Sequence, residues 1–252
     1  GYILQICRSQ SELKQCKKTG TSLGFVPTMG ALHEGHLSLV RRAKQECDQV
    51  CVSIFVNPTQ FGPSEDYAKY PRVEDADLRL LEQEFVDMVY LPSLEEIYPE
   101  LCLDKEFDLS QIIIKANLEL SDRLCGSSRP GHFDGVVTVV KRLLDIVIAS
   151  TAKRSSSKLK LYLGEKDYQQ IKVIEEMINR FQLAVEIEAC PIVREPSGLA
   201  MSSRNQYFSD DERSKAAQLY AELKQIRKDI ASGRSFALAK QDSYLRLEAN
   251  DF

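Results

Sequence analysis

Two histidines and two glycines lie close together in the stretch PTMGALHEGH, residues 27–36. The whole chain holds three histidines, and His33 and His36 are two of them. An imidazole can donate an N–H to a phosphate oxygen and stabilise negative charge that develops there. Gly30 and Gly35 let the backbone approach a ligand closely. These residue types favour a phosphate-binding turn at the start of a helix.

The same stretch admits two structural interpretations. The histidines could ligate a metal, or one of them could cap the helix that follows. HEGH lacks the HExxH spacing of zinc hydrolases, and no third ligand is apparent. Because His33 and His36 are three residues apart, we expect them to share one face of the first helical turn.

Two further polar segments follow predicted strands. NPTQFG (57–62) contains Gln60, whose amide can both donate to and accept from a small hydroxy acid. GEKDYQQ (164–170) offers Lys166 to a phosphate and Asp167 to ribose hydroxyls. Taken alone, NPTQFG is by default an ordinary loop with a loop glutamine. For GEKDYQQ, an ordinary helix N-terminus with a stabilising acid and surface charges is a serious alternative.

A fourth segment, AMSSRN (200–205), places two hydroxyls beside Arg204. Hydroxyl and guanidinium donors together suit a pyrophosphate. The alternative is a polar turn between two domains.

Alternating strand and helix signals position the first three segments. Helical periodicity or apolar content predicts helices at 32–47, 73–85, 133–150 and 167–181. Apolar runs predict strands at 22–27, 49–56, 86–92, 159–164 and 183–193, with a further extended segment at 107–114. This β-α-β-α order predicts an α/β fold with a parallel sheet and helices on both faces. Ligands of such sheets bind at the carboxyl ends of the strands.

The pattern changes near residue 190. Residues 194–208 predict a polar loop or hairpin, and 209–233 predict a helix with Ser209 as N-cap and Gly233 as the stop. A last helical stretch reaches Phe252. We therefore predict one domain at 1–190 and a smaller one at 191–252.

Composition narrows the classes of partner. The net charge is -4 and the pI about 5.6, which disfavours nucleic acid. Apolar runs of membrane-spanning length are missing from the sequence, and GYILQICRSQ does not resemble a signal peptide. Seven scattered cysteines without CxxC favour reduced thiols over a disulfide framework or zinc site. We expect a cytoplasmic protein that does not bind a membrane.

Together these segments resemble the pantothenate synthetase family, the pantoate–β-alanine ligases. PTMGALHEGH is similar to that family's version of the HIGH motif of nucleotidylyl transferases, and AMSSRN to its version of the KMSKS loop. SIFVNPTQF, YPR, RPGHFDGV and GEKDYQQ match family blocks in family order, over most of residues 20–215. The link 151–160 is longer and more basic than the family pattern.

The resemblance implies a Rossmann-like domain closed by a smaller α+β lid, usually in a homodimer. The chain stops somewhat short of a typical family C-terminus, which leaves open an incomplete lid. The implied reaction joins pantoate to β-alanine with ATP and Mg²⁺, through a pantoyl adenylate, and gives pantothenate, AMP and pyrophosphate.

Residue roles follow from the same resemblance. His36, His33, Lys166 and Arg204 would be catalytic, while no protein ligand to a metal is implied. Gln60, Gln170 and Phe61 would bind pantoate, and Gln60 would also help hold β-alanine. Residues 62–71 would form a gate over the adenylate, with a disordered surface loop as an equal alternative from the sequence. Arg129 and His132 of RPGHF receive no role, and a buried, hydrogen-bonded histidine is the alternative for His132. ATP would contact Met29, Gly30, Ala31, Leu32, His33, Glu34, Gly35, His36, Gly164, Glu165, Lys166, Asp167, Val193, Met201, Ser202, Ser203 and Arg204.

Two other functions remain open. The HIGH-like stretch alone fits a nucleotidylyl transferase that acts on a phosphorylated acceptor. A nucleotide-binding module without catalysis would be expected to lack some catalytic positions, yet both histidines, Lys166 and Arg204 are present.

Overall fold

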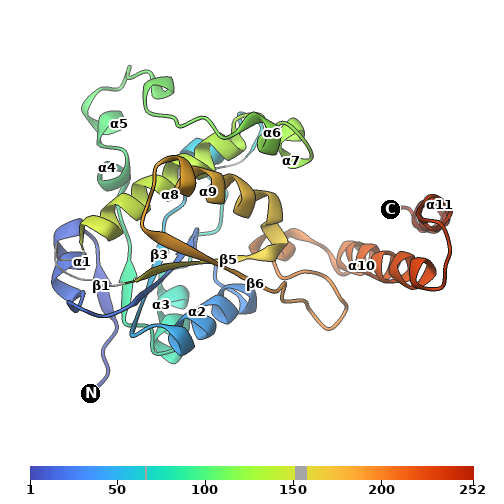
Figure 1. Cartoon of the computed structure of the whole chain (residues 1–252), viewed down its shortest axis with the longest axis horizontal. Coiled ribbons are helices and arrows are strands. Elements are labelled where there is room, and N and C mark those ends of the chain that lie inside the picture. The colour runs from blue at the N-terminus through green and yellow to red at the C-terminus, as the bar shows by residue number, and fades with distance from the viewer. Residues whose placement is uncertain (66, 151–157) are drawn as a thin grey trace. The chain divides into compact units, whose positions relative to one another are not determined.

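The computed structural model describes residues 1–65, 67–150 and 158–252, and in this part of the chain six strands form one sheet. All neighbouring strands pair in parallel, in the order β1-β4-β3-β2-β5-β6 (Figure 1). This confirms the predicted parallel α/β sheet. The strands are β1 (Gln5–Cys7), β2 (Leu23–Thr28), β3 (Gln49–Ile54), β4 (Met88–Tyr90), β5 (Leu159–Gly164) and β6 (Val185–Cys190).

Helices cover both faces of the sheet (Figure 1). Side chains alternate between the faces along each strand, so Phe25 packs with residues of α1, α8 and α9, whereas its neighbour Val26 packs with α2 and α3. Strands buried on both faces need apolar residues at every position, which explains the continuous apolar runs. The helices are α1 (Gln10–Cys16), α2 (Glu34–Glu46), α3 (Glu74–Gln83), α4 (Leu94–Ile97), α5 (Pro99–Leu103), α6 (Leu118–Ser121), α7 (Cys125–Ser128), α8 (His132–Ala149), α9 (Tyr168–Arg180), α10 (Asp210–Ala231) and α11 (Phe236–Glu248).

The strand order creates a switch point beside β2. From β2 the chain builds β3 and β4 on one side, then crosses to build β5 and β6 on the other. In open parallel sheets the crevice at such a point, outside the carboxyl ends of the strands, is the usual ligand site. The loops after β2, β3 and β5 therefore occupy the position where binding is expected.

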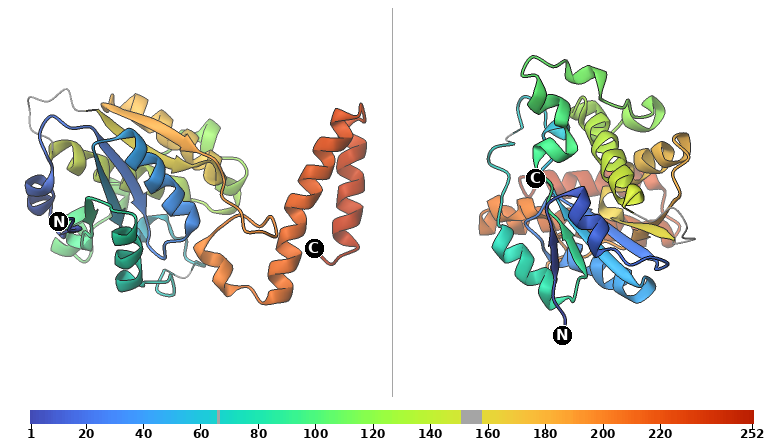
Figure 2. Two further views of the ribbon diagram at one scale, coloured as in Figure 1. Left: turned by 90° about the horizontal axis from the view of Figure 1, so that it is seen from below. Right: turned by 90° about the vertical axis from the view of Figure 1, so that its left-hand side faces the viewer.

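The chain forms two compact units, Gly1–Leu32 with His36–Pro191, and His33–Gly35 with Ile192–Phe252. In the second unit α10 and α11 lie side by side in opposite directions (Figure 2). Ser209 caps α10 through a capping box with Glu212. The β structure of residues 192–252 is a single antiparallel bridge between Arg194 and Ala200.

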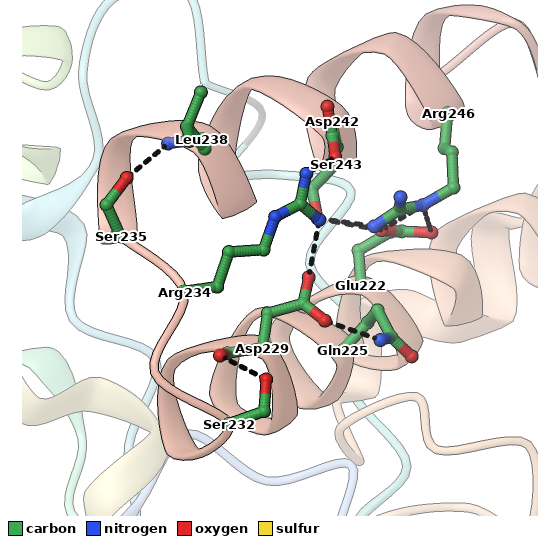
Figure 3. Close-up of polar contacts among 10 residues, drawn as sticks. All are labelled: Glu222, Gln225, Asp229, Ser232, Arg234, Ser235, Leu238, Asp242, Ser243 and Arg246. Atoms are coloured by element: carbon green, nitrogen blue, oxygen red, sulfur yellow. Dashed lines mark hydrogen bonds and ion pairs between the residues drawn. The ribbon is translucent and has the colours of Figure 1, made fainter.

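Polar contacts join α10 and α11 at their connection and along their length (Figure 3). Arg234, in the connection between the helices, pairs with Asp229 of α10 and Asp242 of α11. Glu222 of α10 accepts hydrogen bonds from Arg246 of α11 at 2.7 Å and from Ser243 at 2.8 Å.

The extended segment predicted at 107–114 is wrong. Leu109–Gln111 form a 3-10 turn, with the Asp108 side chain accepting the N–H of Ser110 at 3.0 Å. Ile112 and Ile114 pack against the core instead, and Ile114 N–H donates to Thr138 of α8. The basic link predicted at 151–160 lies mostly outside the described residues.

The structure also shows the state of the cysteines and the character of the helices. All seven cysteines are free thiols, with Cys7, Cys51 and Cys190 buried and Cys102 and Cys125 exposed. No helix in the described residues is long and apolar enough to cross a membrane.

Candidate active site

Three of the four polar segments emerge at one edge of the sheet. They follow β2, β3 and β5, which are adjacent and parallel, so their carboxyl ends lie side by side. The structure thus brings together the loops that carry Met29–Leu32, Gln60 and Gly164–Gln170. The fourth segment, 200–205, belongs to the second unit.

The loop after β2 is held by a buried carboxylate. Gly30 and Ala31 both have positive φ, at 77° and 50°. Asp77, in the first turn of α3, accepts the N–H of Ala31 at 2.9 Å and that of Leu32 at 2.8 Å. Burial raises the pKa of the Asp77 carboxyl, although these two hydrogen bonds act to lower it. A left-handed backbone that costs free energy at Ala31 is therefore fixed by a residue from another helix.

The sequence did not single out Asp77. It lies among the acids of a first helical turn, Glu74, Asp75 and Asp77, where acids are common because they favour the helix dipole. Its side chain is only 2 % exposed, however. One signal in the sequence could have indicated that Asp77 is buried. It lies four residues before Leu81, so both side chains lie on the same face of the helix, and Leu81 is buried.

His33 caps the helix that follows it. It precedes Glu34, the first residue of α2, and its Nδ1 accepts the N–H of Gly35 at 3.0 Å. His36 lies within α2, so the two histidines differ in role within the turn. Of the two structural interpretations, capping is what the structure shows for His33. An Nδ1 that accepts carries no hydrogen, so in the neutral ring the hydrogen is on Nε2.

Gly35 is required by this cap. A Cβ atom there would lie 2.6 Å from Cε1 and 2.8 Å from Nδ1 of His33. The same atom would lie 3.6 Å from Cβ of Met201. Any larger residue would displace the imidazole from the N–H that it accepts.

The turn after β3 orients the amide of Gln60. Asn57 is 1 % exposed, and its Nδ2 donates to Oε1 of Gln60 at 3.0 Å and to the carbonyl of Gly135 at 3.1 Å. The Asn57 Oδ1 in turn accepts from the hydroxyls of Thr59 at 2.9 Å and Tyr98 at 2.8 Å. Since Oε1 of Gln60 is engaged, Nε2 is the end that can donate to an anionic oxygen. Asn57 is a further residue that sequence reasoning missed.

The segment after β5 presents charges at a helix N-terminus. Glu165–Asp167 form a 3-10 turn that leads into α9, and all three side chains are exposed. Asp167 immediately precedes α9, but its side chain makes no capping hydrogen bond. Lys166 Nζ lies 4.0 Å from an Asp167 oxygen. Gln170 is half-buried in the first turn of α9.

In the second unit, the 200–205 segment is held by backbone and by a buried amide. Met201 N–H donates to the carbonyl of Val193 at 2.9 Å. Ser202 caps the following 3-10 turn by accepting the N–H of Arg204 at 3.3 Å, which leaves its O–H as a donor. Asn205, 8 % exposed, donates to the carbonyl of Ala200 at 3.0 Å. Arg204 itself is exposed.

A family model and several named relatives match this chain and are described by the same activity. The family model described as pantoate-beta-alanine ligase matches residues 3–251. The pantothenate synthetase of Thermotoga petrophila is 51% identical over 222 residues, which are 88% of this chain and 72% of that protein. That of Fervidobacterium nodosum is 44% identical over 248 residues, 97% of this chain and 82% of that protein.

Solved structures show the same likeness. A pantothenate synthetase from Thermus thermophilus matches with a TM-score of 0.86 at 41% identity, over 97% of this chain and 82% of that one. The Francisella tularensis pantoate-beta-alanine ligase, crystallised with beta-gamma ATP and beta-alanine, matches with a TM-score of 0.76 at 40% identity, over 88% of this chain and 80% of that one. With the parallel sheet and the loops at its edge, these matches show that the chain belongs to the pantoate-beta-alanine ligase family.

Proposed function

We propose that the chain condenses pantoate with β-alanine at the expense of ATP, giving pantothenate, AMP and pyrophosphate. The observation that carries this proposal is the family match over residues 3–251. The Francisella relative, which holds an ATP compound and β-alanine, supports the choice of substrates.

The reaction has two steps. A pantoate carboxylate oxygen attacks the α-phosphorus of ATP and displaces pyrophosphate, forming the pantoyl adenylate. The β-alanine amine then attacks the acyl carbonyl, and AMP leaves with the bonding electron pair. Because the substrates supply both nucleophiles, the protein's task is to position them and stabilise charge.

The phosphate chain of ATP is assigned to the N-terminus of α2 and to four side chains, two imidazoles and two basic groups. His36 would donate to the phosphate where charge develops, and His33 would donate through Nε2, the nitrogen that its cap leaves protonated. Lys166 and Arg204 would neutralise the departing pyrophosphate. Met29–Gly35 and Val193 are assigned to the nucleotide, as are Gly164, Glu165, Asp167, Met201, Ser202 and Ser203.

Pantoate is assigned to the turn after β3. Gln60 Nε2 would donate to its carboxylate, an orientation supported by the Asn57 bond to Oε1. Gln170 would bind the acid from α9. Phe61, whose ring contacts Tyr67 and Tyr70 at centroid distances of 5.4 and 5.9 Å, would pack against the dimethyl group.

Magnesium is proposed to enter with ATP. Within the described residues no group of three His, Cys, Asp or Glu side chains is arranged to hold a metal ion. Phosphate oxygens would therefore be its main ligands, as is usual for this ion, and it would offset the charge of the triphosphate. Family resemblance also supports a cytoplasmic homodimer in which residues 191–252 act as a lid.

Exchange of labelled pyrophosphate into ATP tests the function. We expect exchange that requires pantoate and a divalent cation, and AMP formation that further requires β-alanine. Exchange driven by a phosphorylated acceptor would instead indicate a nucleotidylyl transferase. ATP binding without any exchange would indicate a non-catalytic module.

A further inference from the structure

Arg129 and His132 lie at the junction between α7 and α8. The resemblance assigns neither of them a role. His132 is the first residue of α8 and is 8 % exposed. Arg129 follows α7, and 28% of its side chain is exposed. Both side chains contact the segment that begins at Gln60.

His132 holds the backbone of the substrate-binding turn. Its Nδ1 lies 3.0 Å from the carbonyl oxygen of Gln60. A carbonyl can only accept, so Nδ1 carries the hydrogen. Nε2 is then the acceptor, and it lies 3.3 Å from NH1 of Arg129. The imidazole therefore links the turn to the guanidinium.

Arg129 connects His132 to Glu65, which lies further along the same segment. Its Nε donates to Oε1 of Glu65 at 2.5 Å, and Oε2 of Glu65 accepts the N–H of Gly62 at 2.9 Å. Burial acts to raise the pKa of Glu65, but these hydrogen bonds outweigh it and hold the pKa below its ordinary value. Glu65 is thus an anion in the range where an ATP-dependent enzyme works.

Close packing sets the same turn against α8. A Cβ atom on Gly135 would lie 2.3 Å from the carbonyl oxygen of Thr59, so only glycine allows this approach. Gln60 is therefore fixed through its side chain by Asn57, through its backbone by His132, and through Gly62 by the Arg129–Glu65 pair.

We propose that Arg129 and His132 are positioning residues that hold Gln60 and the Gly62–Glu65 segment in place for the two acid substrates. This inference rests on the proposed function, in which Gln60 binds pantoate. It assigns the guanidinium to Glu65 and not to a substrate carboxylate.

Steady-state kinetics of Glu65→Gln, Arg129→Gln and the double variant test the proposal. Each single variant should raise the KM for pantoate about tenfold, the usual effect of breaking one partly buried charge-assisted contact, and leave the KM for ATP within about twofold. The double variant should be no worse than either single one. Glu176→Gln, which breaks the 2.6 Å pair with Arg180 on α9, is the matched control and should have no effect.

Two results would overturn the assignment. A raised KM in Arg129→Gln that is absent from Glu65→Gln would show that Arg129 binds substrate directly. Equal rises in all substrate KM values would show a general structural defect.

His132→Asn, which keeps a donor near the position of Nδ1, should retain more activity than His132→Ala.

Hydrogen exchange makes the test independent of the reaction. The Gly62 amide should exchange faster in Glu65→Gln and Arg129→Gln than in the wild type, because its acceptor is weakened from a carboxylate to an amide in the first and released from Arg129 in the second. Unchanged exchange there would refute the positioning role even if the wild type showed no pantoate-dependent activity. If the wild type showed no pantoate-dependent activity but the variants exchanged faster at Gly62, only the proposed function would be refuted.

Discussion

The Nδ1 atom of His33 accepts the backbone N–H of Gly35 at 3.0 Å. One imidazole thereby satisfies a donor at the N-terminus of α2 and keeps its hydrogen on the opposite nitrogen. Capping and phosphate binding, which the sequence presents as alternatives, use different atoms of the same ring. A substitution can therefore remove the phosphate donor of His33 and keep its capping acceptor.

His33→Asn and His33→Ala should differ in stability and agree in activity. Asparagine places Oδ1 where Nδ1 was and is among the best capping residues, so the free energy of unfolding should change little. Alanine removes the cap and should cost about 1 kcal/mol. Both remove the Nε2 donor, and both should lower kcat about a hundredfold. Thermal unfolding and kcat check this, and full activity in His33→Asn would confine His33 to capping.

His36→Ala should impair chemistry more than binding. Loss of one donor aimed at developing charge raises the barrier by about 3 kcal/mol, roughly a hundredfold in turnover. Calorimetric ATP binding should stay within about threefold, since other groups also hold the phosphates. Gln45→Ala, at an exposed position of the same helix, serves as the control. An unchanged turnover number in His36→Ala would show that the assignment is wrong.

The centre of the sheet could be predicted from the sequence because β2, β3, β4 and β5 are largely buried on both faces. Such strands need apolar residues at every position, and the predicted 49–56 compares with an observed β3 of Gln49–Ile54. β1 and the short helices α4 to α7 were not predicted. β1 is mostly exposed and so lacks the buried apolar run that marks β4, and helices of four or five residues are too short to show a period.

The residues that fix the site could not be predicted, because their contacts are distant in sequence. Asp77 and Ala31 are 46 residues apart, and Arg129 and Glu65 are 64 apart. The periodicity of apolar residues in a sequence reveals only which residues share a face within one or two turns of a helix or along a strand. The motifs that contain His33 and Gln60 can be read from the sequence, and their roles stay predictions. Asp77 and Asn57, whose side chains hold these motifs, emerged only from the packing of α3 and α8.

Asp77→Asn should weaken ATP binding by loosening the loop after β2. The amide replaces one of the two accepting oxygens with a donor, which would face the N–H of Ala31 or Leu32. A buried N–H without a partner costs about 1–3 kcal/mol, so the Kd for ATP should rise about tenfold. Asp75→Asn, at an exposed position of the same helical turn, should bind normally. Calorimetry compares the two, and equal affinity would show that Asp77 does not organise the nucleotide loop.

Glu222 should make the pairing of α10 and α11 depend on pH. The hydrogen bonds from Arg246 lower the pKa of this carboxyl below its ordinary value of 4.5. A carboxyl with a depressed folded-state pKa stabilises the fold above its unfolded pKa and loses that effect as the pH falls through the folded value. Glu222→Gln should therefore speed amide exchange in α11 at pH 7, compared with wild type at the same pH, and the difference should vanish in acid below the carboxyl's pKa. Glu248→Gln, exposed on α11, is the control and should match wild type throughout. A difference that persists in acid would assign the effect to packing and not to the charge.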